Sequence, residues 1–143
     1  MKFKFAVLAA AMMVSGCDTS SATVAEQPVE PVGMEVLQMS DGGQVYFDAA
    51  SIEPDDFDGS PAISGEFVEV LKTNDDGWAY RHSRITAKCG PDHNRATVLK
   101  LVDSNNRPVS ETALAPDSRT LAEKSAYYRT MTDRLCAADG APE

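Results

Sequence analysis

An unbroken run of ten apolar residues, Phe5 to Val14, constrains this chain more than any other feature. The run is too short to cross the hydrocarbon core of a bilayer, which needs about 20 residues. It follows a short basic start with Lys2 and Lys4 and precedes small residues, the arrangement of an export signal. We therefore expect residues 1–16 to be removed as a signal peptide, so that only the residues after them contribute to a folded domain.

The apolar run ends in Val14-Ser15-Gly16-Cys17, which resembles the lipobox of bacterial lipoproteins. In that motif an aliphatic residue and two small residues precede a cysteine. The resemblance implies that Cys17 becomes the first residue of the mature chain and carries acyl chains such as palmitate. Two or three such chains anchor a protein stably, where a single chain binds only marginally. The alternative is an ordinary secretory signal followed by a cysteine with no such role.

The charge of the mature chain limits its partners. Removing residues 1–16 takes away two of the 13 basic residues and none of the 22 acidic ones, so the formal net charge goes from −9 to −11. Such a chain repels nucleic acid and anionic headgroups, so we expect no nucleic-acid partner. Membrane attachment then depends on the acyl chains of Cys17.

Two cysteines remain once Cys17 is assigned to the anchor, Cys89 and Cys136. Disulfides persist in exported proteins, which favours a bridge between these two residues. A metal pair and a redox pair are the alternatives. They fit less well, because the chain has no Cys-x-x-Cys motif and only two histidines, His82 and His93.

The chain divides into three parts after the signal. Residues 17–33 lack aromatic side chains, include two prolines and read as a flexible tether. Residues 34–137 form the domain, and residues 138–143 form a flexible tail. Within the domain, alternating apolar residues predict six strands, at 34–39, 43–48, 65–73, 78–88, 95–102 and 109–114.

The connections between these strands carry recognisable turn signals. Residues 53–61, EPDDFDGSP, read as a loop. Residues 74–77, NDDG, predict a hairpin in which Gly77 takes a positive φ. The apolar positions of the strand at 78–88 change parity, which predicts a bulge near residues 82–84.

The end of the domain is helical in pattern. Ser118 is the expected N-cap, and Cys136 lies at the C-terminal end. One face is predicted to be apolar through Leu121, Ser125, Tyr128, Thr132 and Leu135, with Met131 beside them. The expected fold is therefore α+β, an antiparallel sheet of about six strands with one C-terminal helix packed on a face. Apolar residues on both parities of two strands leave a surplus on the other face, which is either a partner surface or buried by strand curvature.

Several short segments together resemble the surface-adhesin protein E-like domain over residues 34–137. They are VYFDAASI at 45–52, a strand that ends in Cys89, the turn DSNN, the phrase ALAPDS at 113–118, and a terminal helix that ends in Leu135-Cys136. The resemblance implies a small exported protein with an antiparallel sheet, a C-terminal helix and a disulfide that joins them. Two features depart from the family pattern: Asn105-Asn106 replaces the usual glycine turn, and the tryptophan expected a few residues before Pro116 is absent, since residues 111–114 carry no aromatic side chain.

No arrangement of side chains in the sequence indicates catalysis, and we expect no enzyme activity, cofactor or metal. His82 and His93 lack a motif that would orient a base toward a nucleophile. The acidic run at 55–59 lacks the spacing of a calcium loop and is more typical of a solvated turn. The aromatic residues Trp78, Tyr80, Tyr127 and Tyr128 are either a ligand platform or ordinary packing residues.

The sequence therefore favours a membrane-anchored, non-catalytic protein-binding module in the cell envelope. An outward-facing domain would act in adhesion. A periplasmic domain would assist an envelope protein or inhibit a cell-wall hydrolase, and its acidic charge suits a basic partner. A structural component that self-associates through strand edges is the third hypothesis. Asp18, directly after Cys17, resembles a signal for retention in the inner membrane, with the domain facing the periplasm.

Overall fold

The computed structural model describes residues 27–90 and 93–138. The predicted signal peptide, Cys17 and the first part of the tether lie outside the described residues, as does almost all of the predicted tail. Within the described part of the chain, no helix is long and apolar enough to cross a membrane.

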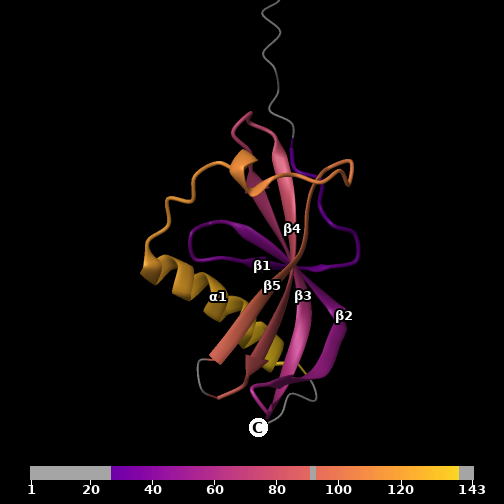
Figure 1. The fold of residues 1–143 in the computed structure, drawn as a ribbon, viewed down its shortest axis with the longest axis vertical. Coiled ribbons are helices and arrows are strands. Elements are labelled where there is room, and N and C mark those ends of the chain that lie inside the picture. The colour runs from indigo at the N-terminus through magenta and orange to yellow at the C-terminus, as the bar shows by residue number, and fades with distance from the viewer. Residues whose placement is uncertain (1–26, 91–92, 139–143) are drawn as a thin grey trace, which may run out of the picture.

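The domain is an antiparallel sheet of five strands with one helix on a face, so the predicted α+β class is confirmed (Figure 1). Each strand pairs with the strand before it in the sequence, in the order β1-β2-β3-β4-β5. The elements are β1 (Glu35–Gln38), β2 (Gln44–Phe57), β3 (Ser60–Lys72), β4 (Trp78–Lys88), β5 (His93–Asp103), a 3-10 turn η1 (Glu111–Ala113) and α1 (Leu121–Cys136).

The prediction of a sixth strand at 109–114 is wrong, and the sheet has five strands. The chain turns back after β5 and makes one bridge, between Val102 and Pro108. Beyond Val109 it leaves the sheet, because the side chain of Ser110 caps η1 by accepting a hydrogen bond from the amide of Thr112. The segment then bonds to the end of the β3–β4 hairpin, where the amide of Asn74 donates to the carbonyl of Ala113 at 2.8 Å.

The loop predicted at 53–61 is instead the end of a long hairpin. Strands β2 and β3 run to within two residues of each other, and Asp58 and Gly59 make the turn with φ of 52° and 76°. Two positive φ values suit the turn type that matches the twist of a hairpin. The irregular part of this hairpin lies further back, where residues 49–52 bulge opposite Gly65.

The turn at 74–77 forms as predicted, but Asp76 rather than Gly77 takes the positive φ, at 63°. The predicted irregularity beside residues 82–84 is also present, since the register of β4 against β5 shifts between His82 and Ser83. The extra residue, however, is Leu99 of β5, and β4 pairs with β3 without interruption. No residue is inserted in β4. The apolar side chains of this strand lie on one face of the sheet in its first half and on the other face in its second half, which explains the change in their alternation.

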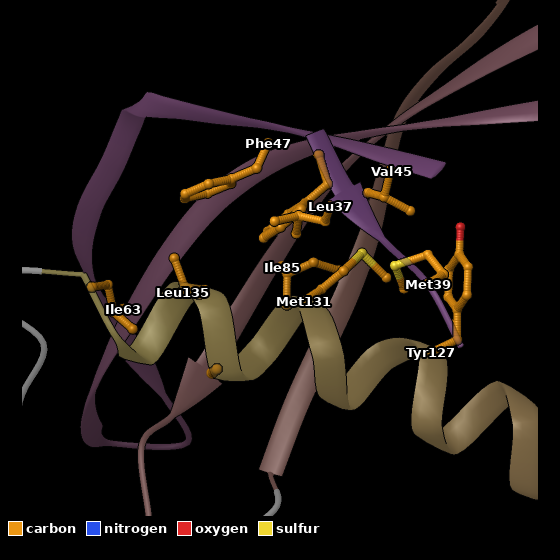
Figure 2. Close-up of a cluster of buried hydrophobic side chains, with 11 residues drawn as sticks. Leu37, Met39, Val45, Phe47, Ile63, Ile85, Tyr127, Met131 and Leu135 are labelled. Atoms are coloured by element: carbon orange, nitrogen blue, oxygen red, sulfur yellow. The ribbon is translucent and has the colours of Figure 1, made fainter. Parts of the chain in front are cut away.

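The main core lies between α1 and the inner face of the sheet, the face that the helix covers (Figure 2). The rings of Phe47 and Phe67 stack with centroids 4.7 Å apart. Gly65 is required for the close approach of the helix, because a Cβ there would lie 3.0 Å from Leu135 Cδ1 and 3.1 Å from Phe47 Cε2.

The stripe that the helix buries agrees only in part with the one predicted. Tyr127, Met131 and Leu135, spaced four residues apart, point into the core, whereas Leu121 is 85% exposed. Of the predicted face, only Met131, Thr132 and Leu135 are buried. The helix also begins later than expected, because Thr120 rather than Ser118 is the N-cap and forms a capping box with Glu123.

The opposite face of the sheet has a smaller buried cluster of its own, made of Tyr46, Val68, Tyr80 and Val102. The segment before β1 contributes to it, since Met34 packs against the cluster and the amide of Val29 donates to the hydroxyl of Tyr80 at 2.6 Å. The apolar surplus predicted for this face is therefore largely buried within the domain.

Candidate binding surface

The two cysteines predicted to pair are joined in a disulfide. Cys89, directly after β4, and Cys136, the last residue of α1, have Cα atoms 5.6 Å apart. Cys136 follows Leu135, which is fully buried over Gly65. The bridge thus fixes the C-terminal end of the helix to the sheet.

The structure keeps the residues considered for chemistry apart. His82 is half-buried on β4 opposite Lys100, and both its burial and the nearby lysine charge hold its pKa below the usual value. His93 lies at the start of β5, opposite Lys88. Among the described residues, no group of three or more histidine, cysteine or acidic side chains is placed to hold a metal ion.

The acidic run at 55–59 belongs to the β2–β3 hairpin. Asp55 accepts a hydrogen bond from the hydroxyl of Thr86 at 2.9 Å, and Asp56 accepts one from the amide of Gly59 at 2.9 Å. Asp56 thus stabilises the turn, and Asp55 ties the hairpin to β4.

The four aromatic residues considered as a platform lie on two sides of the molecule. Trp78 and Tyr80 belong to β4 and pack with the cluster on the outer face of the sheet. Tyr127 and Tyr128 belong to α1, and both pack with the main core on the inner face. No single aromatic surface results from them.

A buried charge cluster lies under the first half of α1. Glu69 on β3 is only 2% exposed, and its Oε2 lies 3.6 Å from Arg81 on β4. Arg81 also pairs with Glu111 at 3.0 Å. Burial raises the pKa of Tyr127, and the nearby Glu69 raises it further, so this hydroxyl stays protonated. A cavity of about 390 Å³ adjoins Arg81 and Tyr127, with both signs of charge in its lining.

The most accessible part of the sheet is the edge formed by β5. All residues from His93 to Lys100 are exposed, including Val98 at 51% and Leu99 at 48%. The returning chain covers this edge only at Leu101 to Asp103, where the amide of Val109 donates to the carbonyl of Leu101 at 3.0 Å. The edge from His93 to Lys100, which we call the open edge, lacks the neighbouring strand that the sequence predicted.

The main-chain groups of the open edge face outward at alternate residues. Leu101 lies opposite Arg81, and its carbonyl bonds to Val109 on the side away from β4. Bonded and non-bonded pairs alternate along an antiparallel ladder. Because β4 has no inserted residue, Ser83, Ile85 and Ala87 keep the orientation of Arg81. Their partners on β5, which are Val98, Ala96 and Asn94, therefore also direct their amides and carbonyls away from β4.

A groove of about 310 Å³ lies along α1 and reaches the open edge at Asn94. It is lined by Asn94 of β5 and by Leu121, Lys124, Ser125, Tyr128, Arg129 and Thr132 of the helix. This is largely the stripe that the helical periodicity predicted for the core. The predicted face is divided: Met131 and Leu135 lie in the core as predicted, together with Tyr127, whereas the other predicted residues border the groove.

The charge of this region differs from that of the whole chain. Residues 93–102 carry Arg95 and Lys100 and no acidic residue, and the charged residues that line the groove are Lys124 and Arg129. Lys124 is partly neutralised by Asp117 at 3.4 Å. The charged side chains of the open edge are thus both basic, on a chain with a net charge of −9.

Comparison with known families, curated proteins and solved structures gave no significant match to this chain. The open edge was not among the site residues predicted from the sequence, because it exists only where residues 109–114 leave the sheet. The one signal that pointed toward it was the run Thr97-Val98-Leu99, which includes two residues of high strand propensity and lies between Arg95 and Lys100.

Proposed function

We propose that the chain is a bacterial lipoprotein, anchored in a membrane by acyl chains on Cys17, whose domain binds another protein and catalyses no reaction. The observation that supports binding most directly is the open edge of β5. A long exposed edge with apolar side chains is a template for pairing with another chain unless it is blocked. Here no described segment of the chain covers residues 93–100.

The disulfide and the core support this role by making the edge rigid. A binding surface on a fixed strand loses little conformational entropy when it is occupied. The tether and acyl chains would place this surface near a membrane. Facing outward it would act in adhesion; facing the periplasm it would act on an envelope protein, for example by inhibiting a cell-wall hydrolase.

Self-association is the second candidate function, and the same edge supports it. Two copies could pair their β5 strands across a two-fold axis, as strand edges often do. Sedimentation of the purified chain over a range of concentrations separates this candidate from binding of a different protein. A concentration-dependent dimer would favour self-association, and a strict monomer would exclude it.

The anchor is tested by fractionation. We expect the wild-type chain to partition with membranes and to incorporate labelled palmitate, and Cys17→Ala to do neither. A Cys17→Ala chain that still fractionates with membranes would exclude this anchor. Protease treatment of intact and permeabilised cells then separates the two locations, since only an outward-facing domain is cleaved in intact cells.

The binding function is tested in cells by placing a photo-crosslinking amino acid at Val98. Val36 of β1, on the opposite edge of the sheet, is the matched control because it is also an exposed valine, at 42%. We expect a cross-linked product of discrete mass from position 98 and none from position 36. The absence of any such product at 98 would argue against a binding role for this edge.

A further inference from the structure

We propose that the open edge of β5 and the groove beside α1 bind an extended segment of a partner protein whose side chains alternate between apolar and acidic. This inference rests on the proposed function, because it specifies what the binding module binds. It follows from three properties of the surface: the direction of the main-chain groups, the lining of the groove and the sign of the charges.

The main chain of β5 determines that the bound segment is extended. Asn94, Ala96 and Val98 direct their amides and carbonyls outward, so an added strand can form about six main-chain hydrogen bonds with them. A peptide that adds a strand to a sheet edge gains affinity from such bonds and specificity from the pockets beside it. The open edge has room for about eight residues of partner chain.

The inner side of the added strand determines the apolar half of the pattern. Ala96 and Val98 lie opposite Ile85 and Ser83, so they are on the side of the sheet that α1 covers. Every second side chain of the partner would therefore lie on this face, toward the helix, and those beside Asn94 would contact the groove. Leu121, 85% exposed, and the half-buried Tyr128 offer apolar contacts there.

The outer side of the added strand determines the acidic half. Arg95 and Lys100 lie opposite Thr86 and His82, which places them on the outer face. Residues next to each other across an antiparallel pair interact directly, and opposite charges stabilise the pair. The acidic charge of the whole chain led us to expect a basic partner. On the outer side of the open edge the charged side chains are Arg95, which also interacts with Asp55 and the ring of Phe57, and Lys100, so the segment that contacts them is acidic.

The direct test is binding of an eight-residue peptide of alternating glutamate and valine, acetylated, amidated and fluorescently labelled, to the purified full-length chain in detergent. Fluorescence anisotropy gives the dissociation constant. We expect saturable binding that weakens with salt, and at least tenfold weaker binding of the matching peptide of alternating lysine and valine. Equal binding of both peptides would overturn the charge argument.

Two variants test the main-chain contacts. Ala96→Pro removes one outward amide and leaves the β4 ladder intact, since proline is tolerated on a sheet edge. Ala96→Val is the matched control, because it keeps the amide. We expect the proline variant to bind about tenfold more weakly and the valine variant to bind like wild type. A folded proline variant with unchanged affinity would overturn strand addition.

An independent measurement covers the case in which Ala96→Pro does not fold. The glutamate–valine peptide is N-methylated at alternate residues, in two forms that block its two main-chain edges separately, and tested against the wild-type chain. Strand addition requires one form to lose binding and the other to keep most of it. Similar affinity for both forms would exclude a strand at this edge.

The groove and the charges are tested by two further changes. Leu121→Glu, an exposed helix position, should weaken binding of the glutamate–valine peptide, and unchanged binding would argue against the groove. Arg95→Glu combined with Lys100→Glu should reverse the preference toward the lysine–valine peptide. A preference that stays acidic would place the contact elsewhere.

The inference and the proposed function can fail separately. If no peptide binds but position 98 still cross-links to another protein in cells, the alternating pattern is wrong and the binding module stands. If sedimentation shows a dimer that Ala96→Pro abolishes and no peptide binds, the edge serves a second copy of the chain, which overturns the inference. If neither the peptide nor the cross-link is seen, both are wrong.

Discussion

Opening the bridge between Cys89 and Cys136 should destabilise the domain more than any change of a single surface side chain. The bridge closes a loop between residues 47 positions apart. In the chain-entropy account, closing a loop of this length restricts the unfolded chain by about 4 kcal/mol at 25 °C. Since domains of this size are stable by only about 5–15 kcal/mol, this is a large share of the total.

The loss of stability should be largest in α1. An isolated helix of 16 residues, the length of α1, is marginal in water. Without the bridge the C-terminal half of the helix is held by side-chain packing, chiefly that of Met131 and Leu135, and by the ion pair between Arg134 and Glu35 of β1. We therefore expect the amides of the last two turns of α1 to exchange with solvent much faster in the reduced protein than those of β3 and β4.

Urea unfolding of a Cys17→Ser background, with and without reductant, measures the effect. With a slope near 1.5 kcal/mol per molar urea, about 4 kcal/mol moves the midpoint down by about 2.5 M. The double variant Cys89→Ala and Cys136→Ala in the same background should match the reduced protein. A loss below about 1 kcal/mol at unchanged slope would refute the loop-closure reasoning.

Three further predictions concern single residues, each measured by urea unfolding. Gly65→Ala should destabilise the fold by about 1–3 kcal/mol, because its Cβ has no room beside Leu135, and a neutral effect would mean that the helix shifts freely. Thr120→Ala should cost about 1 kcal/mol through loss of the helix cap, and an unchanged urea midpoint would contradict this. Hydrogen bonds from Arg119 hold the pKa of Asp117 well below its ordinary value of 3.8, so ionised Asp117 stabilises the folded state above about pH 4 and this stabilisation is lost as the pH falls further. Asp117→Asn should therefore be less stable than wild type at pH 6 and approach it below pH 3, and a constant difference across that range would contradict the assignment.

The sequence predicted the elements whose stability is local. The strand at 78–88, the turn at 74–77 and the terminal helix all appear close to where their patterns placed them. The hairpin at Asp58-Gly59 was missed although Asp-Gly is a strong turn signal, because the surrounding acidic residues and prolines read as loop. Those acidic side chains are in fact bound to the turn and to the neighbouring strand.

The features that decide the binding surface depend on competition between distant segments. Residues 109–114 alternate as a strand would, yet the bond from Asn74 to Ala113, followed by the bond from Ala115 to Lys72, holds this segment at the end of the β3–β4 hairpin and away from β5. The helix carries two apolar stripes, and the bridge at Cys136 and the lack of a side chain at Gly65 select the one that faces the core. Neither outcome follows from periodicity alone.

The position of the bridge also sets the order in which the domain can be completed. Each strand pairs with its immediate predecessor, so the sheet can assemble while the chain is being delivered from its N-terminus. Cys136 arrives last, and until then the inner face of the sheet is uncovered and the thiol of Cys89 has no partner within the domain. A chain halted at this stage is prone to aggregation and to mixed disulfides with its neighbours. Correct oxidation therefore requires that the final helix reach the sheet before Cys89 reacts with another thiol.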